Sequence, residues 1–279
     1  MAKMASTLLI LVSIRNESMS SVFAYSNRII AFIDVLGFGT LVESSATAEN
    51  GGAEAIKRIS EAILESLDEL AWHTSKEVPP FALTQFSDSF VISCESKGPP
   101  SRDLLFFSNA VRNVIDSFLR SSLLLRGGIT RGLLVHNEKL LFGPAMNRAY
   151  FLENEIAQTP RIIVDPELPD LGQVVLDFDL AVDKDGIMYI DYFRISKMFF
   201  LRPQWWLVIQ DYIGKMPKTP KLADKRAWLV EKYNNTIDGF TYASFEKTLM
   251  QYAEDTDNNA VYEDRHKFLS AASQIHRME

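Results

Sequence analysis

Two aspartates, Asp34 and Asp88, stand next to stretches with strand character, and both could bind a divalent cation. Asp34 ends an apolar run that begins at Arg28 and is followed by Gly37 and Gly39. A carboxylate beside a buried strand is costly to desolvate unless a cation meets it. Two carboxylates on neighbouring strands can hold two divalent cations roughly 4 Å apart, which activates an attacking oxygen and neutralises a leaving phosphate. A cap or turn role explains either aspartate alone, so the pair is the stronger signal.

Phosphate-binding groups are expected close to Asp34. Gly37 and Gly39 precede a helical pattern, where backbone N–H groups would be free to approach an anion at a helix N-terminus. Carboxylate, tight turn and helix start together indicate a metal-bound polyphosphate. Arg126 precedes Gly127 in another predicted strand, and its guanidinium could bind phosphate oxygens bidentately. A salt bridge at the rim of the sheet is an equally good interpretation of Arg126.

Further polar candidates follow Gly143 and Pro144, where a helix is predicted. Asn147 could be an ordinary surface residue of that helix or could orient a ribose, and Arg148 could stabilise a transition-state charge. His136 and the other histidines have no second His or Cys at ligand spacing, so a zinc site is not expected. The sequence also contains no serine-elbow, Walker or Rossmann glycine pattern.

The elements that must position these residues alternate along the chain. To about residue 200 the order is strand, two helices, two strands, helix, strand, helix and strand, which predicts a ferredoxin-like α+β fold with helices on one face of a sheet. A tight turn at 87–89 joins two of these strands, Asp-Gly at 185–186 marks a second hairpin, and Ser101 is expected to cap a helix. The expected helices cover about 41–48, 56–70, 101–118 and 145–156, and two further strands cover about 123–135 and 161–165.

The chain divides into three predicted parts. Residues 1–26 are expected to be dispensable or loosely packed, because their apolar run is too short for a membrane span and no cleavage site follows it. A translation start at Met19 would remove most of this segment. Residues 27–200 form the α+β domain. Residues 201–279 carry apolar stripes at helical spacing, which predict a helical extension packed on the sheet domain or on a second subunit.

Composition limits the function classes. The 279 residues include 47% apolar and 23% charged side chains, which is typical of a globular protein and excludes wholesale disorder. A net charge of −7 argues against non-specific nucleic-acid binding, so local cations must hold any anionic ligand. The single cysteine, Cys94, provides no disulfide framework, and a reducing cytoplasm is the expected location.

Four motifs in order resemble the catalytic domain of class III nucleotidyl cyclases, and most of all the bacterial pyrimidine cyclases of Pycsar anti-phage defence. The resemblance covers roughly residues 27–200. The motifs are Phe32-Ile33-Asp34-Val35-Leu36-Gly37-Phe38, Phe86-Ser87-Asp88-Ser89-Phe90, Arg126-Gly127-Gly128-Ile129-Thr130-Arg131-Gly132 and Gly143-Pro144-Ala145-Met146-Asn147. Each is weak alone, and together they are fairly specific.

The resemblance assigns roles to these positions. Asp34, the Val35 carbonyl and Asp88 would hold two Mg²⁺ or Mn²⁺ ions per site, while Arg126 binds the distal phosphates. The phosphates would also be cradled by three backbone amides, those of Gly37, Phe38 and Gly39. Asn147 would orient the ribose, whose 3′-hydroxyl attacks the α-phosphorus and displaces pyrophosphate. In the family these groups come from two facing subunits, which implies a homodimer.

The chain departs from the family pattern at three positions. The transition-state arginine of the family corresponds to Phe151, so Arg148 or Arg131 would have to replace it. The purine-reading lysine corresponds to Thr84 and its polar partner to Leu140. A threonine hydroxyl can form a single hydrogen bond to the edge of a smaller base, which favours a pyrimidine.

The favoured function is therefore a pyrimidine cyclase that converts UTP, or less favourably CTP, into a cyclic mononucleotide as an anti-phage signal. Two alternatives stay open: a purine cyclase, and a degenerate cyclase-like module that only binds nucleotide. The presence of both carboxylates favours an enzyme. Expected partners are the ribonucleoside triphosphate, a second copy of the chain and a separate effector activated by the cyclic nucleotide, with neither nucleic acid nor a membrane.

Overall fold

The structure is a computed structural model of the chain. It describes residues 24–47, 52–72, 80–168, 180–193 and 203–238, and thereafter 243, 246–247, 250–251, 267 and 269–279. The predictions for the N-terminal segment before residue 24, including the apolar run and Met19, lie outside the described residues.

The fold is α+β, as predicted, and is built on one mixed sheet. The strands are β1 (Ser26–Val35), β2 (Ala82–Phe86), β3 (Ser89–Glu95), β4 (Leu125–His136), β5 (Leu141–Phe142), β6 (Ile162–Val164), β7 (Leu180–Val182) and β8 (Met188–Ile190). Their order is β2-β3-β1-β4-β6-β8-β7, with β5 paired to the far end of β4. β1 is antiparallel to both neighbours, and β4 and β6 are parallel.

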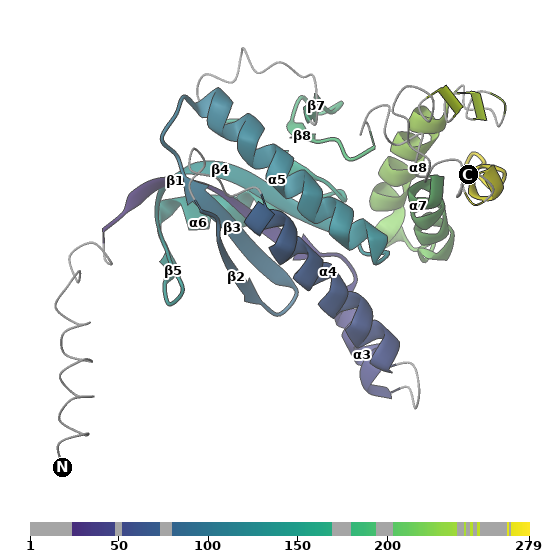
Figure 1. Cartoon of the computed structure of the whole chain (residues 1–279), viewed down its shortest axis with the longest axis horizontal. Helices are drawn as coiled ribbons and strands as arrows, with labels where there is room; N and C mark the ends of the chain where they lie inside the picture. Colours follow the sequence, from purple (N-terminus) through teal and green to yellow (C-terminus); the bar gives the residue numbers. More distant parts are fainter. Residues whose placement is uncertain are drawn as a thin grey trace.

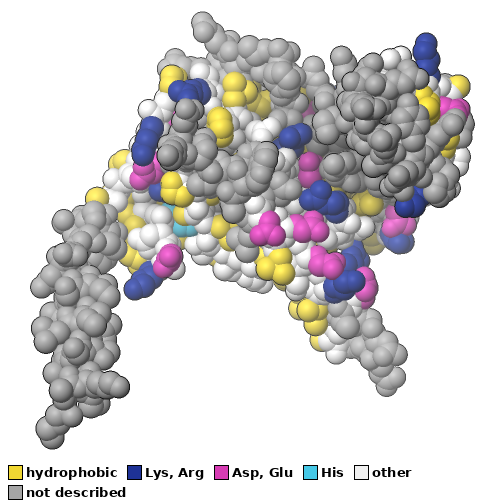
Figure 2. Space-filling model, viewed as in Figure 1, with side chains coloured by type: hydrophobic (Ala, Val, Ile, Leu, Met, Phe, Trp, Pro, Cys, Tyr) yellow, Lys and Arg dark blue, Asp and Glu magenta, His cyan; other side chains and the backbone are white. Residues whose placement is uncertain are grey.

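The helices cover both faces of this sheet. They are α3 (Phe38–Thr47), α4 (Gly52–Trp72), α5 (Pro100–Arg120), α6 (Pro144–Phe151) with the π-helical turn η1 (Leu152–Ile156), α7 (Pro203–Lys215), the 3₁₀ turn η4 (Pro220–Leu222) and α8 (Ala223–Ile237). Figure 1 shows α4 and α5 lying together across the sheet, with α7 and α8 grouped beyond one end of α5. In Figure 2 acidic and basic side chains are interspersed over the visible face of the described residues.

Strand β1 is central because its side chains are apolar on both faces. Ile29 and Ile33 join the cluster that contains the buried side of α5, whereas Ile30 and Phe32 join a smaller cluster with Ala149 of α6. Since successive residues of a strand point to opposite faces, α5 and α6 lie on opposite sides of the sheet. The expectation that helices cover only one face is therefore wrong.

Glycine at position 128 lets α6 and η1 approach β4. A Cβ on Gly128 would lie 2.4 Å from the Leu152 Cβ and 3.0 Å from the Ala149 carbonyl oxygen. No larger side chain fits without moving the helix, so the small residues seen inside this predicted strand mark a close helix contact. This contact brings η1, and with it Glu153, over the beginning of β4.

The C-terminal helices pack on the sheet domain. Trp206 and Ile209 of α7 and Trp228 and Tyr233 of α8 belong to the same hydrophobic cluster as the sheet. This is one of the two packing modes expected for the extension, although the boundary at residue 200 stays a prediction. No helix among the described residues combines the length and the apolar character needed to cross a membrane.

One helix start differs from the prediction. Helix α5 begins at Pro100 and has Pro99 as its N-cap, so Ser101 lies inside the first turn rather than at the cap. The first turn is stabilised instead by Asp103, which accepts hydrogen bonds from the Gly98 N–H at 3.2 Å and from the Ser96 hydroxyl. Proline at the first helical position explains the early start, because its fixed φ suits a helix and it needs no N–H acceptor there.

Candidate functional site

The strand register brings the first aspartate between two polar partners. Asp34 is opposite Ser89 of β3 and opposite Arg126 of β4. The Ser89 hydroxyl donates to the Asp34 carboxylate at 3.4 Å, and Arg126 Nη2 lies 3.8 Å from Asp34 Oδ2. Asp34 shares its face of the sheet with Phe32, so its carboxylate is on the α6 side.

The second aspartate is held beside the first by a backbone hydrogen bond. The register of β2 and β3 leaves Ser87 and Asp88 as the two residues of the hairpin turn, and the Val35 N–H donates to the Asp88 carbonyl at 2.9 Å. Ser87 has a φ of 56°, in the left-handed region that non-glycine residues seldom occupy. The predicted convergence of Asp34 and Asp88 at one end of the sheet is confirmed.

A third carboxylate, which the sequence reading missed, completes the cluster. Glu153 of η1 has a side chain only 5% exposed and forms an ion pair with Arg126 Nη2. A carboxylate four residues after the buried Ala149 falls on the buried side of a helix, and that spacing is the signal that could have revealed it. Arg126 therefore bridges two carboxylates. We call Asp34, Asp88, Arg126 and Glu153 the candidate site.

Negative charge dominates the candidate site. Burial raises the pKa of Asp34 to about 6, with further contributions from the charges of Glu153 and Asp88 that Arg126 does not fully offset. Burial likewise raises the pKa of Glu153. A site with three carboxylates and one contacting guanidinium attracts cations, because added positive charge relieves the repulsion.

The donors present suit a hard divalent cation. Carboxylate and carbonyl oxygens are the ligands that Mg²⁺ and Mn²⁺ prefer, and Asp34, Asp88 and the Val35 carbonyl supply them at one end of the sheet. The described residues contain no group of three His, Cys, Asp or Glu side chains arranged to hold a metal ion. Any ion bound here would thus need oxygens from its substrate or from water, as Mg²⁺ commonly does.

A helix N-terminus follows immediately. Gly37 has a φ of +77°, and helix α3 starts at the next residue, Phe38. The first N–H groups of a helix have no partners within the helix and can bind an anion. The turn predicted at Gly37 is confirmed, whereas Gly39 already lies in α3, which begins earlier than the predicted helix start at about residue 41. The Phe38 side chain packs against the hydrophobic core and lines a small pocket next to Asp88.

The structure does not bring the α6 candidates to the site of the same chain. Arg148 is held by Asp165, with Nη2 2.6 Å from Oδ1 and Nε 2.9 Å from Oδ2, and by Glu167 at 3.1 Å. The hydrogen bonds that Arg148 donates to the Asp165 carboxylate raise the pKa of Arg148. Asn147 is exposed on the surface of α6. Arg131, the other proposed replacement, donates weakly to the Gly98 carbonyl at 3.4 Å.

Thr84 belongs to a separate polar chain. Its hydroxyl is 3.0 Å from His136 Nε2, and His136 Nδ1 is 2.8 Å from the Ser93 hydroxyl, which also accepts from Arg28. Burial, reinforced by the Arg28 charge, lowers the pKa of His136 to about 4. The imidazole is therefore neutral at pH 7. Leu140 lies in the turn between β4 and β5, where its N–H donates to Asn137.

Comparisons with known proteins give similarity of shape only. No protein-family model and no curated protein matches the chain. The guanylyl cyclase Cya2 matches with a TM-score of 0.41 and 13% identity, over 60% of this chain and 91% of that chain. The guanylyl cyclase domain of RhoGC from Blastocladiella emersonii matches with a TM-score of 0.41 and 14% identity, over 60% of this chain and 95% of that chain. The guanylate cyclase domain of RhGC from Catenaria anguillulae, in complex with GTP, matches with a TM-score of 0.38 and 15% identity, over 59% of this chain and 94% of that chain.

Proposed function

We propose that the protein is a nucleotidyl cyclase of class III type that converts a pyrimidine ribonucleoside triphosphate, UTP rather than CTP, into its 3′,5′-cyclic mononucleotide and pyrophosphate. The observation that carries this proposal is the pairing of Asp34 with Asp88 beside Arg126 and the N-terminus of α3. Carboxylates for divalent cations, a guanidinium and free helix N–H groups are the groups that a metal-bound triphosphate requires.

Each group then has a chemical role. Mg²⁺ or Mn²⁺, two ions per site, held by Asp34, Asp88 and the Val35 carbonyl, would polarise the phosphates and favour ionisation of the ribose 3′-hydroxyl. The bond from the 3′-oxygen to the α-phosphorus forms, the bond from that phosphorus to the bridging oxygen breaks, and pyrophosphate leaves. Arg126 and the N–H groups at Phe38 and Gly39 offset the charge that accumulates on the leaving group.

A homodimer would complete the site. Asn147 is exposed on α6, and several large apolar side chains on or near this helix and the neighbouring hairpins are exposed, which is typical of an interface. They include Phe86 (41% exposed), Phe142 (44%), Tyr150 (51%) and Phe151 (44%). In this arrangement Asn147 of a second copy orients the ribose. Arg148 would first have to leave Asp165 to act on a transition state.

The pyrimidine preference concerns the base pocket. The Thr84 hydroxyl, which contacts the neutral His136, can offer one further hydrogen bond without a formal charge, and a smaller ring needs fewer such contacts. The cyclic mononucleotide would act as an anti-phage signal read by a separate effector protein. A purine cyclase is the competing proposal, and the two differ in product rather than in the metal chemistry.

Product analysis tests the activity. Purified protein incubated with Mn²⁺ and all four ribonucleoside triphosphates at equal concentration should yield mainly cyclic UMP, with Asp34→Asn and Asp88→Asn each reducing turnover by about a thousandfold or more. Asp185→Asn, whose carboxylate is 43% exposed in another hairpin, is the matched control. Dominant cyclic AMP or cyclic GMP would contradict the pyrimidine preference, and near-normal activity of either site variant would contradict the metal chemistry.

Subunit mixing tests the shared site. Asp34→Asn and Asn147→Ala should each be inactive alone, and heterodimers formed by mixing them should recover one working site per dimer. Sedimentation measures the oligomeric state, and labelled subunits show whether exchange has occurred. A monomer with full activity, or no recovery despite exchange, would rule out sharing of the site between two copies.

A further inference from the structure

The polar chain that contains Thr84 begins at a buried arginine and ends at the Thr84 hydroxyl. Arg28 of β1 donates from Nε to the Ser93 hydroxyl of β3 at 2.8 Å and from Nη2 to the Ser93 carbonyl at 3.2 Å. The Ser93 hydroxyl is 2.8 Å from His136 Nδ1, and His136 Nε2 is 3.0 Å from the hydroxyl of Thr84 in β2. The first three members are buried, whereas Thr84 is partly exposed. Thr84 is thus the member that a ligand can reach.

The chemistry of these groups fixes the direction of each hydrogen bond. Arginine only donates, so the Ser93 oxygen accepts from Arg28. Ser93 is completely buried, and within the described part of the chain its hydroxyl has one other hydrogen-bond partner, His136 Nδ1. A buried hydroxyl proton without an acceptor is costly, so Ser93 donates this proton to Nδ1. Because His136 is neutral at pH 7, its own proton is on Nε2, and Nε2–H donates to Thr84.

The Thr84 hydroxyl therefore keeps a free proton. Its oxygen accepts from His136, and a threonine hydroxyl has one proton of its own to donate. Among the described residues, His136 Nε2 is the single hydrogen-bond partner of this hydroxyl. Thr84 consequently presents a hydrogen-bond donor to whatever approaches it.

Thr84 lies on the face of the sheet that carries the Asp34 carboxylate. Thr84 is opposite Val91 in the pair of β2 and β3, and Val91 is opposite Phe32 in the pair of β3 and β1. Directly opposed residues share a face, and Asp34 is two residues after Phe32. Two strand spacings of about 4.8 Å and two residues of about 3.3 Å place Thr84 about 12 Å from Asp34. An extended nucleoside triphosphate with its phosphates at Asp34 has a comparable length.

We propose that His136 is a positioning residue that holds the Thr84 hydroxyl as a hydrogen-bond donor, so that the base pocket selects a base with a carbonyl group, uracil, over a base with an amino group, cytosine. This rests on the proposed function and gives the physical cause of its choice between pyrimidines. Uracil has a carbonyl acceptor at the ring position where cytosine has an amino donor. Two donors that face each other both stay unpaired, and a site built on such contacts discriminates strongly.

Nucleoside diphosphates test this selection without turnover, because they have no pyrophosphate to release. UDP and CDP, each with Mn²⁺, are titrated into the full chain by calorimetry, and kcat and KM are measured for UTP and CTP. Wild type should bind UDP at least about tenfold more tightly than CDP. Thr84→Val removes the hydroxyl and should bring the two affinities within about threefold of each other, by weakening UDP rather than by strengthening CDP.

Two changes of similar size at His136 separate orientation from packing. In His136→Gln the amide oxygen can accept from Ser93 while the amide nitrogen donates to Thr84, so the preference for UDP should persist. In His136→Glu the carboxylate, kept ionised by Arg28, only accepts. Thr84 must then donate to it and present an oxygen to the base, so CDP should bind more tightly than UDP. KM should change more than kcat, because neither change touches the metal ligands.

The matched control is Thr236→Val on α8, whose hydroxyl donates to the Lys232 carbonyl at 2.8 Å. It should bind both diphosphates as wild type does. Unfolding midpoints are recorded for every variant, and Thr84→Val tests the proposal independently of any change at His136. Equal ratios of UDP to CDP affinity in wild type, Thr84→Val and His136→Glu would overturn the positioning role, and so would a wild type that prefers CDP.

The two proposals fail in different ways. If wild type cyclises UTP but binds UDP and CDP equally, the positioning role is wrong and the cyclase proposal stands. If wild type forms no cyclic nucleotide, yet prefers UDP and loses that preference in His136→Glu, the positioning role stands and the cyclase proposal is wrong. If wild type binds no uridine nucleotide, both are overturned.

Discussion

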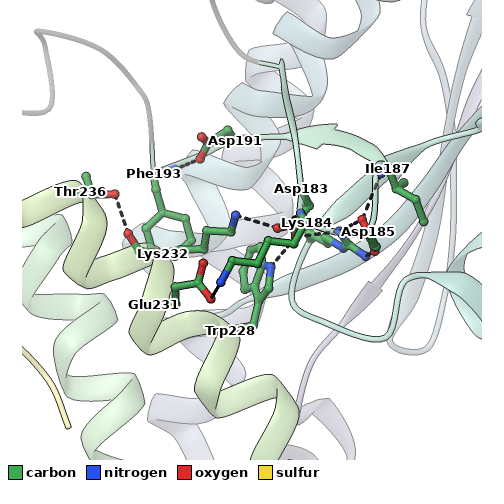
Figure 3. Close-up of polar contacts among 11 residues, drawn as sticks. Asp183, Lys184, Asp185, Ile187, Asp191, Phe193, Trp228, Glu231, Lys232 and Thr236 are labelled. Atoms are coloured by element: carbon green, nitrogen blue, oxygen red, sulfur yellow. Dashed lines mark hydrogen bonds and ion pairs between the residues drawn. The ribbon is translucent and has the colours of Figure 1, made fainter.

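Two aspartates of this protein, Asp34 and Asp183, lie at strand ends near an arginine, yet their surroundings shift the pKa of the carboxyl group in opposite directions. Asp183 has a side chain only 6% exposed and accepts hydrogen bonds from Arg161 and, as Figure 3 shows, from Lys232 and Trp228. Burial alone would raise its pKa, but the hydrogen bonds from Lys232 and Trp228 outweigh burial and lower it to about 2. Asp34 has one cation at 3.8 Å and a long hydrogen bond from a serine, and its pKa is raised to about 6.

The difference lies in how many charges face each carboxylate. Around Asp183 two carboxylates meet two cations, since Asp185 also pairs with Arg161. Around Asp34 the carboxylates outnumber the contacting cations. A balanced buried network stabilises the fold and has little to gain from a ligand, whereas an unbalanced one stores repulsion that a bound cation relieves. The contrast therefore distinguishes a structural network from a binding site within one sheet.

The largest effect is expected at the balanced network. Asp183→Asn removes the charge that Arg161 and Lys232 share, which leaves buried cations without a full partner and should lower the free energy of unfolding by about 3–5 kcal/mol. Denaturant titration followed by circular dichroism measures the change. Asp185→Asn is the control, because its carboxylate is 43% exposed and its loss should cost about 1 kcal/mol or less. An equal loss of unfolding free energy in Asp183→Asn and Asp185→Asn would show that the burial of Asp183 does not matter for stability.

At the candidate site, removal of an aspartate charge is expected to raise the free energy of unfolding rather than lower it. Asp34→Asn removes one of three neighbouring negative charges while Arg126 keeps Glu153 as its partner. The metal-free variant should be more stable than wild type, on the order of 1 kcal/mol, even though it loses the proposed activity. The same denaturant titration in the presence of a chelator measures this gain. A clear loss of stability would mean that Asp34 belongs to the structural framework.

Local signals in the sequence were sufficient for most of the fold. The run around Ile30 and Ile33 predicted a central strand because it is apolar without interruption, and the Asp-Gly pair at Gly186 predicted the hairpin of β7 and β8. The position of α6 on the other face could not be predicted in this way. It depends on Gly128 meeting Leu152, and the periodicity of either segment says nothing about that contact.

The candidate site was predictable only where local sequence patterns mark its residues. Asp34 and Arg126 lie close to an end of β1 and β4, and Asp88 lies in the turn after β2, which are positions that local patterns reveal. Glu153 lies in a helical turn, and only tertiary packing brings it near residues that are far away in the chain. The roles predicted for Asn147, Thr84 and the amides after Gly37 stay predictions. The structure instead shows Arg148 paired with Asp165.

The two aspartates should also differ in their pH dependence. Asp34 has a folded pKa of about 6, above its unfolded value, so the stability gain of Asp34→Asn is complete above pH 6 and disappears as the pH falls toward 4. Asp183 has a folded pKa of about 2, below its unfolded value, so its contribution is complete above about pH 4 and is lost as the pH falls through 2. Unfolding experiments near pH 5 should therefore show the full loss of stability for Asp183→Asn. For Asp34→Asn they should show a much smaller gain of stability than at pH 7.

The smallest effect on stability concerns two hairpin turns, the one that follows Asp183 and the one that contains Asp88. The turn after Asp183 places a glycine, Gly186, at a φ of +79°, whereas the turn that contains Asp88 places Ser87 at 56°. A left-handed conformation costs a residue with a Cβ about 1 kcal/mol or more, while glycine adopts it freely. Ser87→Gly should therefore stabilise the protein slightly, by less than about 1 kcal/mol, because the extra entropy of an unfolded glycine offsets part of the relief. Gly186→Ser, the matched reverse change, should destabilise it by about 1 kcal/mol. Thermal unfolding of the two variants gives both signs, and a Ser87→Gly variant less stable than wild type would show that the serine side chain contributes more than its strained backbone costs.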